Sequence, residues 1–349
     1  MYSIIDAHVH CRDQNQRDKE TIFHALRVAG EVGLAAIFDM PNTDPPVISK
    51  KNVLERLTLA ERVSTKAFYG THMGLTADKA QIKEAVETYK EYFPRVVGLK
   101  LYAGPSVGSL AVSKEEDQLS IYKTLTELGY EGVLVVHCEK ESLLREDLWN
   151  PLKPITHTLA RPPEAEIESV KDQIRFYHYS KFPGHLHITH ISDPRTVEIV
   201  YNEKHNANIS SAITPHHALL DKSIMERENG AFWKMNPPLN TKEAADTLLK
   251  YLKEGKIDIV SSDHAPHTYK EKTEKYLSGI PVLPFWPWFV NILKEKGFSE
   301  KRIREITFSN VAKIYGLEKY IKPREIKPLF YLAREYPADK SFDPFAHLK

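Results

Sequence analysis

Near its start the chain reads Ile4-Ile5-Asp6-Ala7-His8-Val9-His10-Cys11-Arg12, and this stretch decides between two α/β folds. Its apolar residues predict a short β-strand, and His8, His10 and Arg12 come where that strand ends. An open, doubly wound sheet would normally carry a glycine-rich phosphate-binding turn at this point. The stretch contains no glycine, so a closed barrel is favoured over the open sheet.

Seven further apolar runs follow along the chain, and segments with helical periodicity separate them. The eight candidate strands span residues 4–8, 34–38, 67–70, 96–101, 132–137, 185–190, 207–213 and 257–262. In segments 22–29, 167–177 and 244–252, apolar residues recur every three or four positions, as on one face of a helix. Strands that alternate with helices predict a parallel sheet, which a chain of this length closes into a TIM-type (β/α)8 barrel.

The barrel domain is expected to span residues 1–318, and residues 319–349 are expected to form a C-terminal tail packed on it. The tail has mixed charge, several prolines and no clear period. Before it, segment 278–288 is rich in proline and tryptophan, and we expect an ordered loop that leads into a further helix.

The composition is that of a folded, soluble protein and limits the class of partner. Of 349 residues, 48 are Lys or Arg and 47 are Asp or Glu, a formal net charge of +1. This balance argues against nucleic acid or a membrane surface held by bulk electrostatics. No segment approaches the ~18 apolar residues of a membrane span, and the N-terminus does not read as a signal peptide. With only Cys11 and Cys138 as cysteines, a reducing, cytoplasmic location is the simpler expectation.

Polar side chains recur at the C-terminal ends of the candidate strands, where parallel barrels place their active sites. They are His8 and His10 on the first strand, Asn42 after the second, Lys100 on the fourth, His137 on the fifth, His190 on the sixth, and Asp263 with His267 after the eighth. Chance would scatter such residues along the strands. Their common position predicts one shared site at this end of the barrel.

The residue types at that site suit metal binding. His8 and His10 are two positions apart, so an extended strand directs both imidazoles to one face, which suits two ligands of one metal. A buried lysine beside metal ligands would be costly as a free ammonium. Lys100 suits this position if carbon dioxide carboxylates its amine and the resulting anion bridges two cations.

Seven short motifs, taken together, resemble those of the dihydroorotases, which are cyclic amidohydrolases of pyrimidine synthesis in the amidohydrolase superfamily. The motifs run in order over most of the chain and are jointly highly specific. They are Asp6-Ala7-His8-Val9-His10-Cys11-Arg12, Met40-Pro41-Asn42-Thr43, Gly98-Leu99-Lys100-Leu101-Tyr102, Val136-His137-Cys138-Glu139, Ile188-Thr189-His190-Ile191-Ser192, Asn236-Pro237-Pro238-Leu239 and Ser262-Asp263-His264-Ala265-Pro266-His267.

The resemblance implies a binuclear zinc site with two Zn²⁺ ions per subunit. Carboxylated Lys100 and a hydroxide would bridge the two ions. The ligands would be His8, His10 and Asp263 for one ion, and His137 and His190 for the other.

The same resemblance implies a substrate site and a reaction. Arg12, Asn42 and His267 would bind the substrate carboxylate, and Asn236 with neighbouring backbone would contact the pyrimidine ring. The planar guanidinium of Arg12 also matches a carboxylate physically. The implied reaction is the reversible hydrolysis of (S)-dihydroorotate to N-carbamoyl-L-aspartate in UMP synthesis. The metal-bridging hydroxide would attack the ring carbonyl, while Asp263, as general acid/base, would pass the proton to the departing nitrogen.

Two alternative functions stay open. Hydantoinases and allantoinases share the barrel and metal site, but a neutral hydantoin would leave the buried guanidinium of Arg12 unpaired. A non-catalytic homologue could instead be a scaffold for aspartate transcarbamoylase, although such a homologue would be expected to lose metal ligands. The expected partner is the small-molecule substrate, and a homo-oligomer and association with aspartate transcarbamoylase are left open. Residues 104–109, after Lys100, form a segment that we hypothesise closes over the substrate.

One departure from the resemblance concerns the chain ends. Many relatives flank the barrel with a small β-sandwich that is built from both ends. Here the first strand begins almost at Met1, and the sequence after Tyr315-Gly316-Leu317 lacks the usual glycine and acidic pattern. The sandwich is therefore expected to be absent or vestigial.

Several other residues receive structural interpretations. His187 shares a strand with His190, and because alternation turns the two to opposite faces we expect it in the core or facing a helix. Cys11 and Cys138 should be small buried hydrophobes turned away from the metals. Arg161 could reach the site or could simply precede a helix. Two roles stay open for His72, His216 and His217: they could line the pocket mouth, but structural or surface roles are at least as expected. Surface positions are expected for His157 and His178, and packing on the barrel for Trp286 and Trp288.

Overall fold

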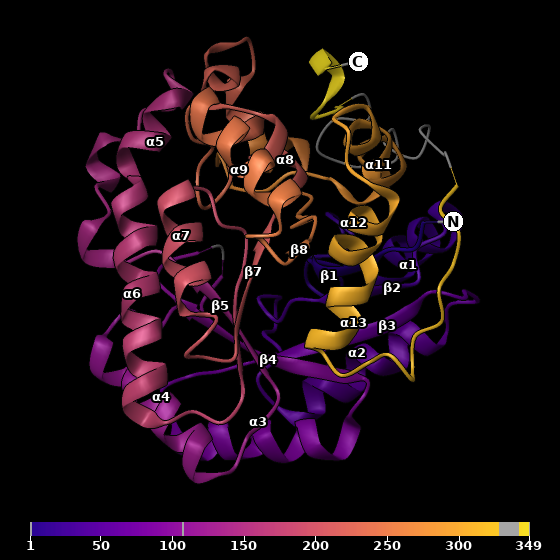
Figure 1. Cartoon of the computed structure of the whole chain (residues 1–349), viewed down its shortest axis with the longest axis vertical. Coiled ribbons are helices and arrows are strands. Elements are labelled where there is room, and N and C mark those ends of the chain that lie inside the picture. The colour runs from indigo at the N-terminus through magenta and orange to yellow at the C-terminus, as the bar shows by residue number, and fades with distance from the viewer. Residues whose placement is uncertain (1, 107, 328–341, 349) are drawn as a thin grey trace.

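The computed structural model describes residues 2–106, 108–327 and 342–348. Eight parallel strands form one sheet in which each strand lies beside the next in chain order (Figure 1). The strands are β1 (Ile5–Val9), β2 (Ala36–Asp39), β3 (Phe68–Gly74), β4 (Val96–Ala103), β5 (Val133–Cys138), β6 (His185–Ile188), β7 (Ile209–Ile213) and β8 (Ile259–Val260). The chain after β8 returns to β1, where His10 N donates to the His264 carbonyl at 2.8 Å. The sheet is a nearly closed barrel, which confirms the predicted TIM-type fold.

Helices cover the outside of the barrel (Figure 1). The three helical segments that the sequence predicts lie within α1, α6 and α9. The helices are α1 (Ile22–Val32), α2 (Lys50–Glu61), α3 (Lys79–Tyr92), α4 (Glu115–Glu127), α5 (His157–Ala160), α6 (Pro163–Ser180), α7 (Pro194–Glu203), α8 (Pro215–Leu219), α9 (Lys242–Glu254), α10 (Tyr269–Thr273), α11 (Trp286–Glu295), α12 (Glu300–Arg304) and α13 (Asn310–Ile314). A π-helical turn, Glu305–Ser309, joins the last two.

The ends of α1 show how local chemistry sets an element. Thr21 caps its start, since its hydroxyl oxygen accepts from His24 N at 3.1 Å. The helix ends at Gly33, whose φ of 89° is left-handed and is disfavoured for residues with a side chain. A Cβ atom at this position would also lie 2.1 Å from the Glu325 carbonyl oxygen. Glycine is therefore required here by backbone conformation and by space.

Two apolar layers hold the barrel. The outer layer lies between strands and helices and includes Leu134 and Val136 of β5 with Ile174 of α6. The inner layer fills the barrel, where Val135 packs with Phe38 and other strand residues. Because successive strand residues point to opposite faces, the same strand supplies both layers. Burial of both layers from water is the main stabilising contribution to such a fold.

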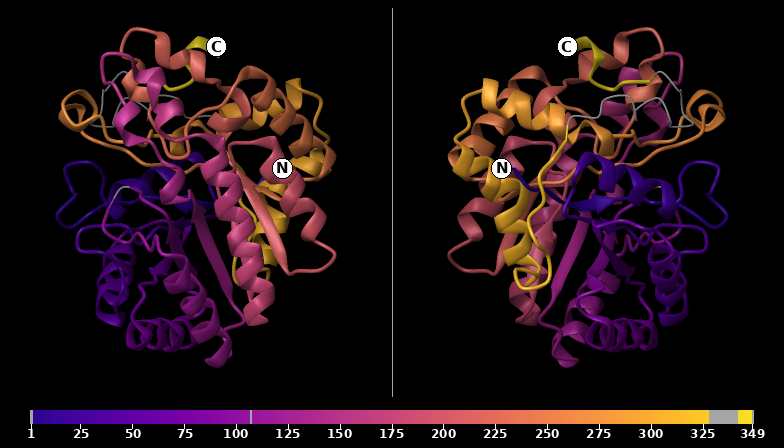
Figure 2. Two further views of the ribbon diagram at one scale, coloured as in Figure 1. Left: turned by 90° about the vertical axis from the view of Figure 1, so that its left-hand side faces the viewer. Right: turned by 90° about the vertical axis from the view of Figure 1, so that its right-hand side faces the viewer.

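Long excursions follow β5, β7 and β8 and gather over one end of the barrel (Figure 2). The short 3-10 turn Pro154–Thr156, after β5, contacts the turns Lys222–Glu226 and Gly230–Trp233, which follow β7. These excursions leave from the C-terminal ends of the parallel strands. They build the walls of any site at that end.

The described parts of the C-terminal tail contact the body of the protein. Arg324 N donates to Ser3 Oγ at 2.9 Å, and Ile326 N donates to the Tyr2 carbonyl at 3.2 Å. Farther on, the ring of Phe345 stacks on Trp288 with centroids 4.8 Å apart. Residues 328–341 of the expected tail lie outside the described residues. The division at residues 318 and 319 stays a prediction.

Within the described ranges, all eight named strands belong to the barrel sheet. The absence of a flanking sandwich stays a prediction as well. None of the helices in the same ranges has the length and apolar character that crossing a bilayer requires.

Candidate active site

An irregularity in β1 directs His8 and His10 toward the barrel axis. Ile5 and Ala7 belong to the inner layer, so strict alternation would turn His8 away from the interior. The pairing of β1 with β2 shifts between Asp6 and Val9, and Val9 belongs to the outer layer. The extra residue in β1 reverses the alternation. Both histidines then face the interior.

The buried carboxylate of Asp6 stabilises this irregular segment. Its Oδ1 accepts from His8 N at 3.4 Å and from Ser262 N at 2.9 Å, which ties β1 to the segment after β8. Its Oδ2 accepts from the indole nitrogen of Trp286 at 2.7 Å. Trp286 is buried, and so is Trp288, as the expected packing on the barrel requires.

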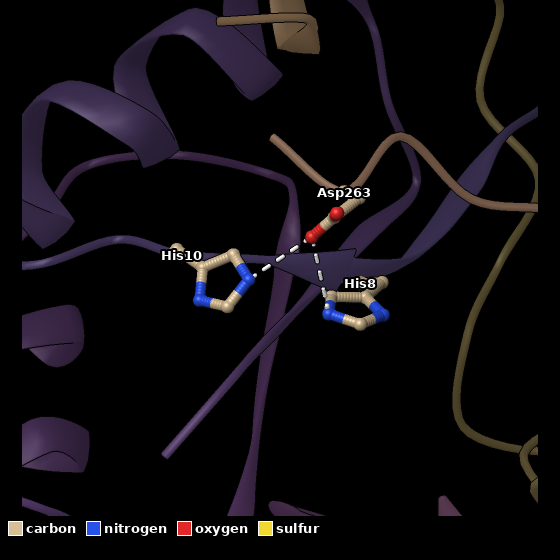
Figure 3. A group of neighbouring side chains, drawn as sticks. All are labelled: His8, His10 and Asp263. Carbon is tan, nitrogen blue, oxygen red and sulfur yellow. Dashed lines mark hydrogen bonds and ion pairs between the residues drawn. The ribbon is translucent and has the colours of Figure 1, made fainter. Parts of the chain in front are cut away.

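His8, His10 and Asp263 form a compact group of metal-binding donors. Asp263 Oδ1 lies 3.3 Å from His8 Nε2 and 3.0 Å from His10 Nε2, and both rings turn toward this one oxygen (Figure 3). The candidate ligand atoms all lie within 4.8 Å of one another. Asp263 has a φ of 47°, an uncommon conformation for a residue with a side chain that often occurs at functional sites. Burial raises the pKa of Asp263 to about 6.

A second pair of imidazoles comes from β5 and from the residues that follow β6. His137 Nδ1 lies 3.0 Å from His190 Nε2. The other nitrogen of His137, Nε2, lies 3.1 Å from Glu139 Oε2. His190 reaches the pair through a left-handed backbone with a φ of 38°. The rings of His8 and His190 have centroids 5.4 Å apart, so the two groups are neighbours.

Lys100 lies among these candidate ligands. An irregular pairing between β3 and β4 places Val97 in the inner layer and Leu99 in the outer layer, so Lys100 points inward. The side chain is fully buried, and its Nζ has no hydrogen-bond partner among the described residues. Burial lowers the pKa of this ammonium to about 7, although Asp263 opposes the shift.

The protonation states of this donor set fit a metal. Burial lowers the pKa of His8, His10 and His190 well below the usual value, and it also lowers that of His137. These imidazoles are therefore neutral near pH 7, as metal ligands must be. The orphaned amine of Lys100 adds a group that requires neutralisation. The site that the sequence predicts thus carries donors of the right type in the right state.

Arg12 lies beside the donors and has spare hydrogen-bonding capacity. The side chain is buried, with Nε donating to the Pro266 carbonyl at 3.3 Å and Nη2 lying 3.3 Å from His267 Nε2. In the described part of the chain, Nη1 is buried without a hydrogen-bond partner. Burial lowers the pKa of Arg12, but a guanidinium stays charged in proteins.

The other predicted substrate residues line or support the same cavity. Asn42 and Asn236 are among its lining residues, and Asn236 Oδ1 accepts from Ser278 Oγ at 3.0 Å. His267 lies behind Arg12, with its Nδ1 3.3 Å from Glu271 and its Nε2 2.9 Å from the Ser278 carbonyl. Burial lowers the pKa of His267 to about 3, so this ring is neutral. The structure thus brings together all ten residues that the sequence selects, and their roles stay predictions.

The cavity itself is small. Its volume is about 30 Å³. Ser106, from the segment predicted to close over substrate, lines it. Residue 107 of that segment lies outside the described residues, and closure stays a hypothesis.

Sequence reasoning missed several residues of the site. Tyr102 lines the cavity, and its ring lies 5.0 Å from Lys100 Nζ; the two-residue spacing on one strand could have indicated it. Ser278, Gly279 and Met235 also line the cavity, but no local pattern marks them. Arg161 supports the site from behind, since it donates to both carboxylate oxygens of Glu139 at 3.0 and 2.7 Å.

The interpretation of His157 was wrong, and those of His178 and His187 were right. His157, expected at the surface, is buried because its Nε2 contacts the Met235 carbonyl at 2.9 Å and Asn236 Oδ1 at 3.0 Å. His178 does lie at the surface, near Glu203. His187 is a core residue that contacts Ser210 Oγ at 2.7 Å. The alternation argument for it was incomplete, however, because the left-handed backbone at His190 brings both rings to the barrel side.

The remaining expectations concern buried side chains. Cys11 and Cys138 are free, buried members of the outer layer, as expected. His217 is buried, with its Nδ1 2.8 Å from Thr214 Oγ1 and its Nε2 3.1 Å from the Pro237 carbonyl. His72 is also buried, with its Nδ1 3.2 Å from the Asp39 carbonyl.

Comparison with known proteins places this chain in a family. No protein-family model matches the chain. The dihydroorotase of Methanosphaera stadtmanae is 31% identical over 325 residues, which are 90% of this chain and 70% of that protein. The dihydroorotase of Archaeoglobus fulgidus is 30% identical over 322 residues, 90% of this chain and 72% of that protein. The chain belongs to the dihydroorotase family.

Solved structures with the same barrel are cyclic amidohydrolases. An L-hydantoinase (dihydropyrimidinase) from Arthrobacter aurescens superposes with a TM-score of 0.81 at 21% identity, covering 93% of this chain and 73% of the other. A dihydroorotase from Campylobacter jejuni gives a TM-score of 0.70 at 20% identity, covering 93% and 86%. At these identities the likeness shows the shared fold. Amidohydrolases of this family are metal-dependent, and this dihydroorotase-family chain has a candidate His/Asp metal site.

Proposed function

We propose that this chain catalyses the zinc-dependent, reversible hydrolysis of (S)-dihydroorotate to N-carbamoyl-L-aspartate in pyrimidine synthesis. The observation that carries the proposal is the buried guanidinium of Arg12 beside the candidate metal ligands. Its Nη1 is without a hydrogen-bond partner among the described residues, which is costly for a buried donor. A ring substrate that carries a carboxylate would supply the missing acceptor in a strong, charge-assisted bond.

The donor set supports two zinc ions. His8, His10 and Asp263 would hold one ion, and His137 with His190 would hold the other. Carboxylated Lys100 would bridge them, since an amine whose pKa is about 7 leaves a large neutral fraction to react with carbon dioxide. When bound, zinc at such a site supplies a water of lowered pKa and polarises a carbonyl oxygen.

The protein side chains would position the substrate and move a proton. Arg12, Asn42 and His267 would hold the carboxylate at one end of the ring, and Asn236 would contact the ring itself. Asp263 would accept the proton from the attacking water and deliver it to the ring nitrogen as the C–N bond breaks.

Two alternatives give different results in one experiment. A hydantoinase-type enzyme would accept a neutral ring, and a scaffold for aspartate transcarbamoylase would need no zinc. A homo-oligomer, association with aspartate transcarbamoylase and a cytoplasmic location stay predictions. They are independent of the chemistry proposed here.

The test is an assay of the purified protein with dihydroorotate and with hydantoin, with zinc measured in the same sample. We expect preferential turnover of dihydroorotate and about two zinc ions per chain. Arg12→Met should lower kcat/KM for dihydroorotate by about 100-fold, because a charge-assisted bond is lost, while any turnover of hydantoin stays unchanged. Preferential turnover of hydantoin would refute the substrate. Zinc near zero in inactive protein purified without chelator would favour the scaffold.

A further inference from the structure

The backbone that carries Arg12 is held in a strained conformation. Arg12, Asp13 and Gln14 have φ angles of 52°, 72° and 50°, so three consecutive residues with side chains are left-handed. This region is disfavoured for such residues and persists only where surrounding contacts impose it. The contacts that impose it therefore determine where the Arg12 guanidinium points.

Some of these contacts are local. Asp13 Oδ1 accepts from Gln14 N at 2.7 Å, and Asp13 Oδ2 accepts from Ile22 N at 2.8 Å. They fix the shape of the turn and join it to the start of α1. They do not join the backbone of Arg12 to the barrel, whereas its side chain bonds the Pro266 carbonyl and lies beside His267.

A buried ion pair makes that connection. Arg56, on α2, donates through Nη1 to the Arg12 carbonyl. Its Nε donates to Asp39 Oδ2 at 3.0 Å, and its Nη2 donates to the same oxygen. Asp39 Oδ1 in turn accepts from Cys11 N at 2.9 Å. Asp39 and Arg56, both with 0% exposure, thus grip the peptide groups on either side of the Cys11–Arg12 junction.

The pair is held rigidly. Tyr69, on β3, donates its hydroxyl to Asp39 Oδ2 at 2.6 Å, and Asp39 itself ends β2. The geometry depends on the arginine fork, because one planar group contacts the carboxylate and the Arg12 carbonyl together. Desolvation makes a buried ion pair a weak source of net stability. A specific structural role is therefore the better explanation for this one.

We infer that Arg56, together with Asp39, is a positioning residue that aims the Arg12 guanidinium into the cavity and so sets the preference for a ring carrying a carboxylate. The inference rests on the proposed function, in which Arg12 binds that carboxylate. Without the grip on its carbonyl, Arg12 can relax to an ordinary backbone conformation. Its Nη1 then leaves the cavity. His8 and Asp263 keep their places because Asp6 bonds His8 N and Ser262 N, and His10 keeps its place because its backbone nitrogen bonds the His264 carbonyl.

The test compares Arg56→Lys with Arg302→Lys. Lysine keeps the positive charge beside Asp39 but lacks the fork that also reaches the Arg12 carbonyl. Arg302 is a matched control at the opposite end of the barrel, where it donates to the Leu252 and Ile257 carbonyls at 2.8 and 2.6 Å. For each zinc-loaded protein, kcat and KM for dihydroorotate and the urea midpoint are measured. The Kd of orotate, a related ring that carries the same carboxylate, is measured as well.

We expect Arg56→Lys to raise KM and the Kd of orotate by about tenfold or more, since one well-placed charged bond is worth at least that factor. The value of kcat should stay within about threefold, because the reacting groups are untouched. Arg302→Lys should lower the urea midpoint without changing KM or Kd. An unchanged KM and Kd in Arg56→Lys, or an equal rise in Arg302→Lys, overturns the inference.

A second variant covers the case in which Arg56→Lys does not fold. The double variant Asp39→Asn, Arg56→Gln removes both charges together, so no unpaired charge stays buried. It should show the same rise in KM and in the Kd of orotate. If the wild-type protein neither turns over dihydroorotate nor binds orotate, the proposed function fails and the inference fails with it. If the wild type does both while the variants match it, the inference alone fails.

Discussion

Two sets of buried histidines lie in the same barrel, and their surroundings differ. The upper set, His8, His10, His137 and His190, lies at the C-terminal ends of the strands. The lower set, His72 and His187, lies deeper in the barrel, where both rings pack near Tyr315. All six side chains are buried, and burial lowers the pKa of each. Burial alone therefore does not separate a metal ligand from a core residue.

The partners of the ring nitrogens do separate the two sets. In the upper set two rings have a protein group beside one nitrogen: Thr189 Oγ1 lies 2.8 Å from His8 Nδ1, and Glu139 Oε2 lies 3.1 Å from His137 Nε2. The inner nitrogens face one another or Asp263. Outer groups of this kind orient metal-bound imidazoles in proteins. In the lower set, His72 contacts the Asp39 carbonyl and His187 contacts Ser210. Both of these rings therefore have hydrogen-bond partners in the rest of the protein.

The largest expected effect comes from replacing one histidine of each set. His137→Ala should remove a zinc ligand and lower kcat/KM for dihydroorotate by at least about 1000-fold, which corresponds to several kcal/mol of metal-derived stabilisation. His187→Asn should cost about 1–3 kcal/mol of unfolding free energy and leave zinc content and activity near the wild-type values. Metal analysis and kinetics check both. Equal loss of zinc in the two variants would remove the distinction between the sets.

A smaller effect is expected for a residue that contacts a candidate metal ligand. Glu139→Gln weakens the group that holds His137 Nε2, so zinc affinity should fall by about 100-fold, the upper range for such outer groups. Competition with a chelator of known affinity measures the change. The matched control is Asp258→Asn, a partly buried carboxylate that accepts from Ser211 N at 2.8 Å and pairs with Lys204 at 2.8 Å. An unchanged zinc affinity in Glu139→Gln would contradict the orienting role.

The lower set should be detectable as a dependence of stability on pH. Burial lowers the pKa of His72 to about 3, against 6.5 in the unfolded chain. Between these values the unfolded state binds more protons, so the free energy of unfolding falls as the pH falls below about 6.5. From pH 7 to pH 5 this group should account for a loss of about 2 kcal/mol. His72→Asn keeps a donor toward the Asp39 carbonyl but cannot titrate, so urea titrations of this variant should lack that part of the loss. If the unfolding free energy of the variant falls with pH as steeply as that of the wild type, His72 titrates normally in the folded protein.

The smallest effect concerns His8. Thr189→Val removes the hydroxyl 2.8 Å from His8 Nδ1 with little change of shape, and zinc affinity should fall by about tenfold, the lower range for an outer group. The control is Thr124→Val, because that hydroxyl donates within its own helix, to the Ser120 carbonyl at 2.8 Å. Chelator competition on the two proteins should separate them. Identical affinities would mean that Thr189 does not orient the ring.

Sequence alone indicated the barrel and the residues that lie together at the C-terminal ends of its strands. Apolar runs of strand length alternate with helical periodicity along the whole chain, and this local pattern requires no knowledge of distant contacts. Because parallel strands end at one edge, it also placed His8, Lys100 and His137 at one site. It could not place His157, whose burial depends on Met235 and Asn236, residues 78 and 79 positions away.

Only the tertiary structure decided how the ligands and Arg12 are aimed. The irregularity in β1 depends on Asp6, which bonds Ser262 at a separation of 256 residues, and His190 reaches its partner through a left-handed backbone. Arg12 is aimed through Arg56, 44 residues farther along. Period-two alternation would have turned His8 and His190 out of the site. Such exceptions to local rules are held by long-range hydrogen bonds, and a sequence pattern does not contain them.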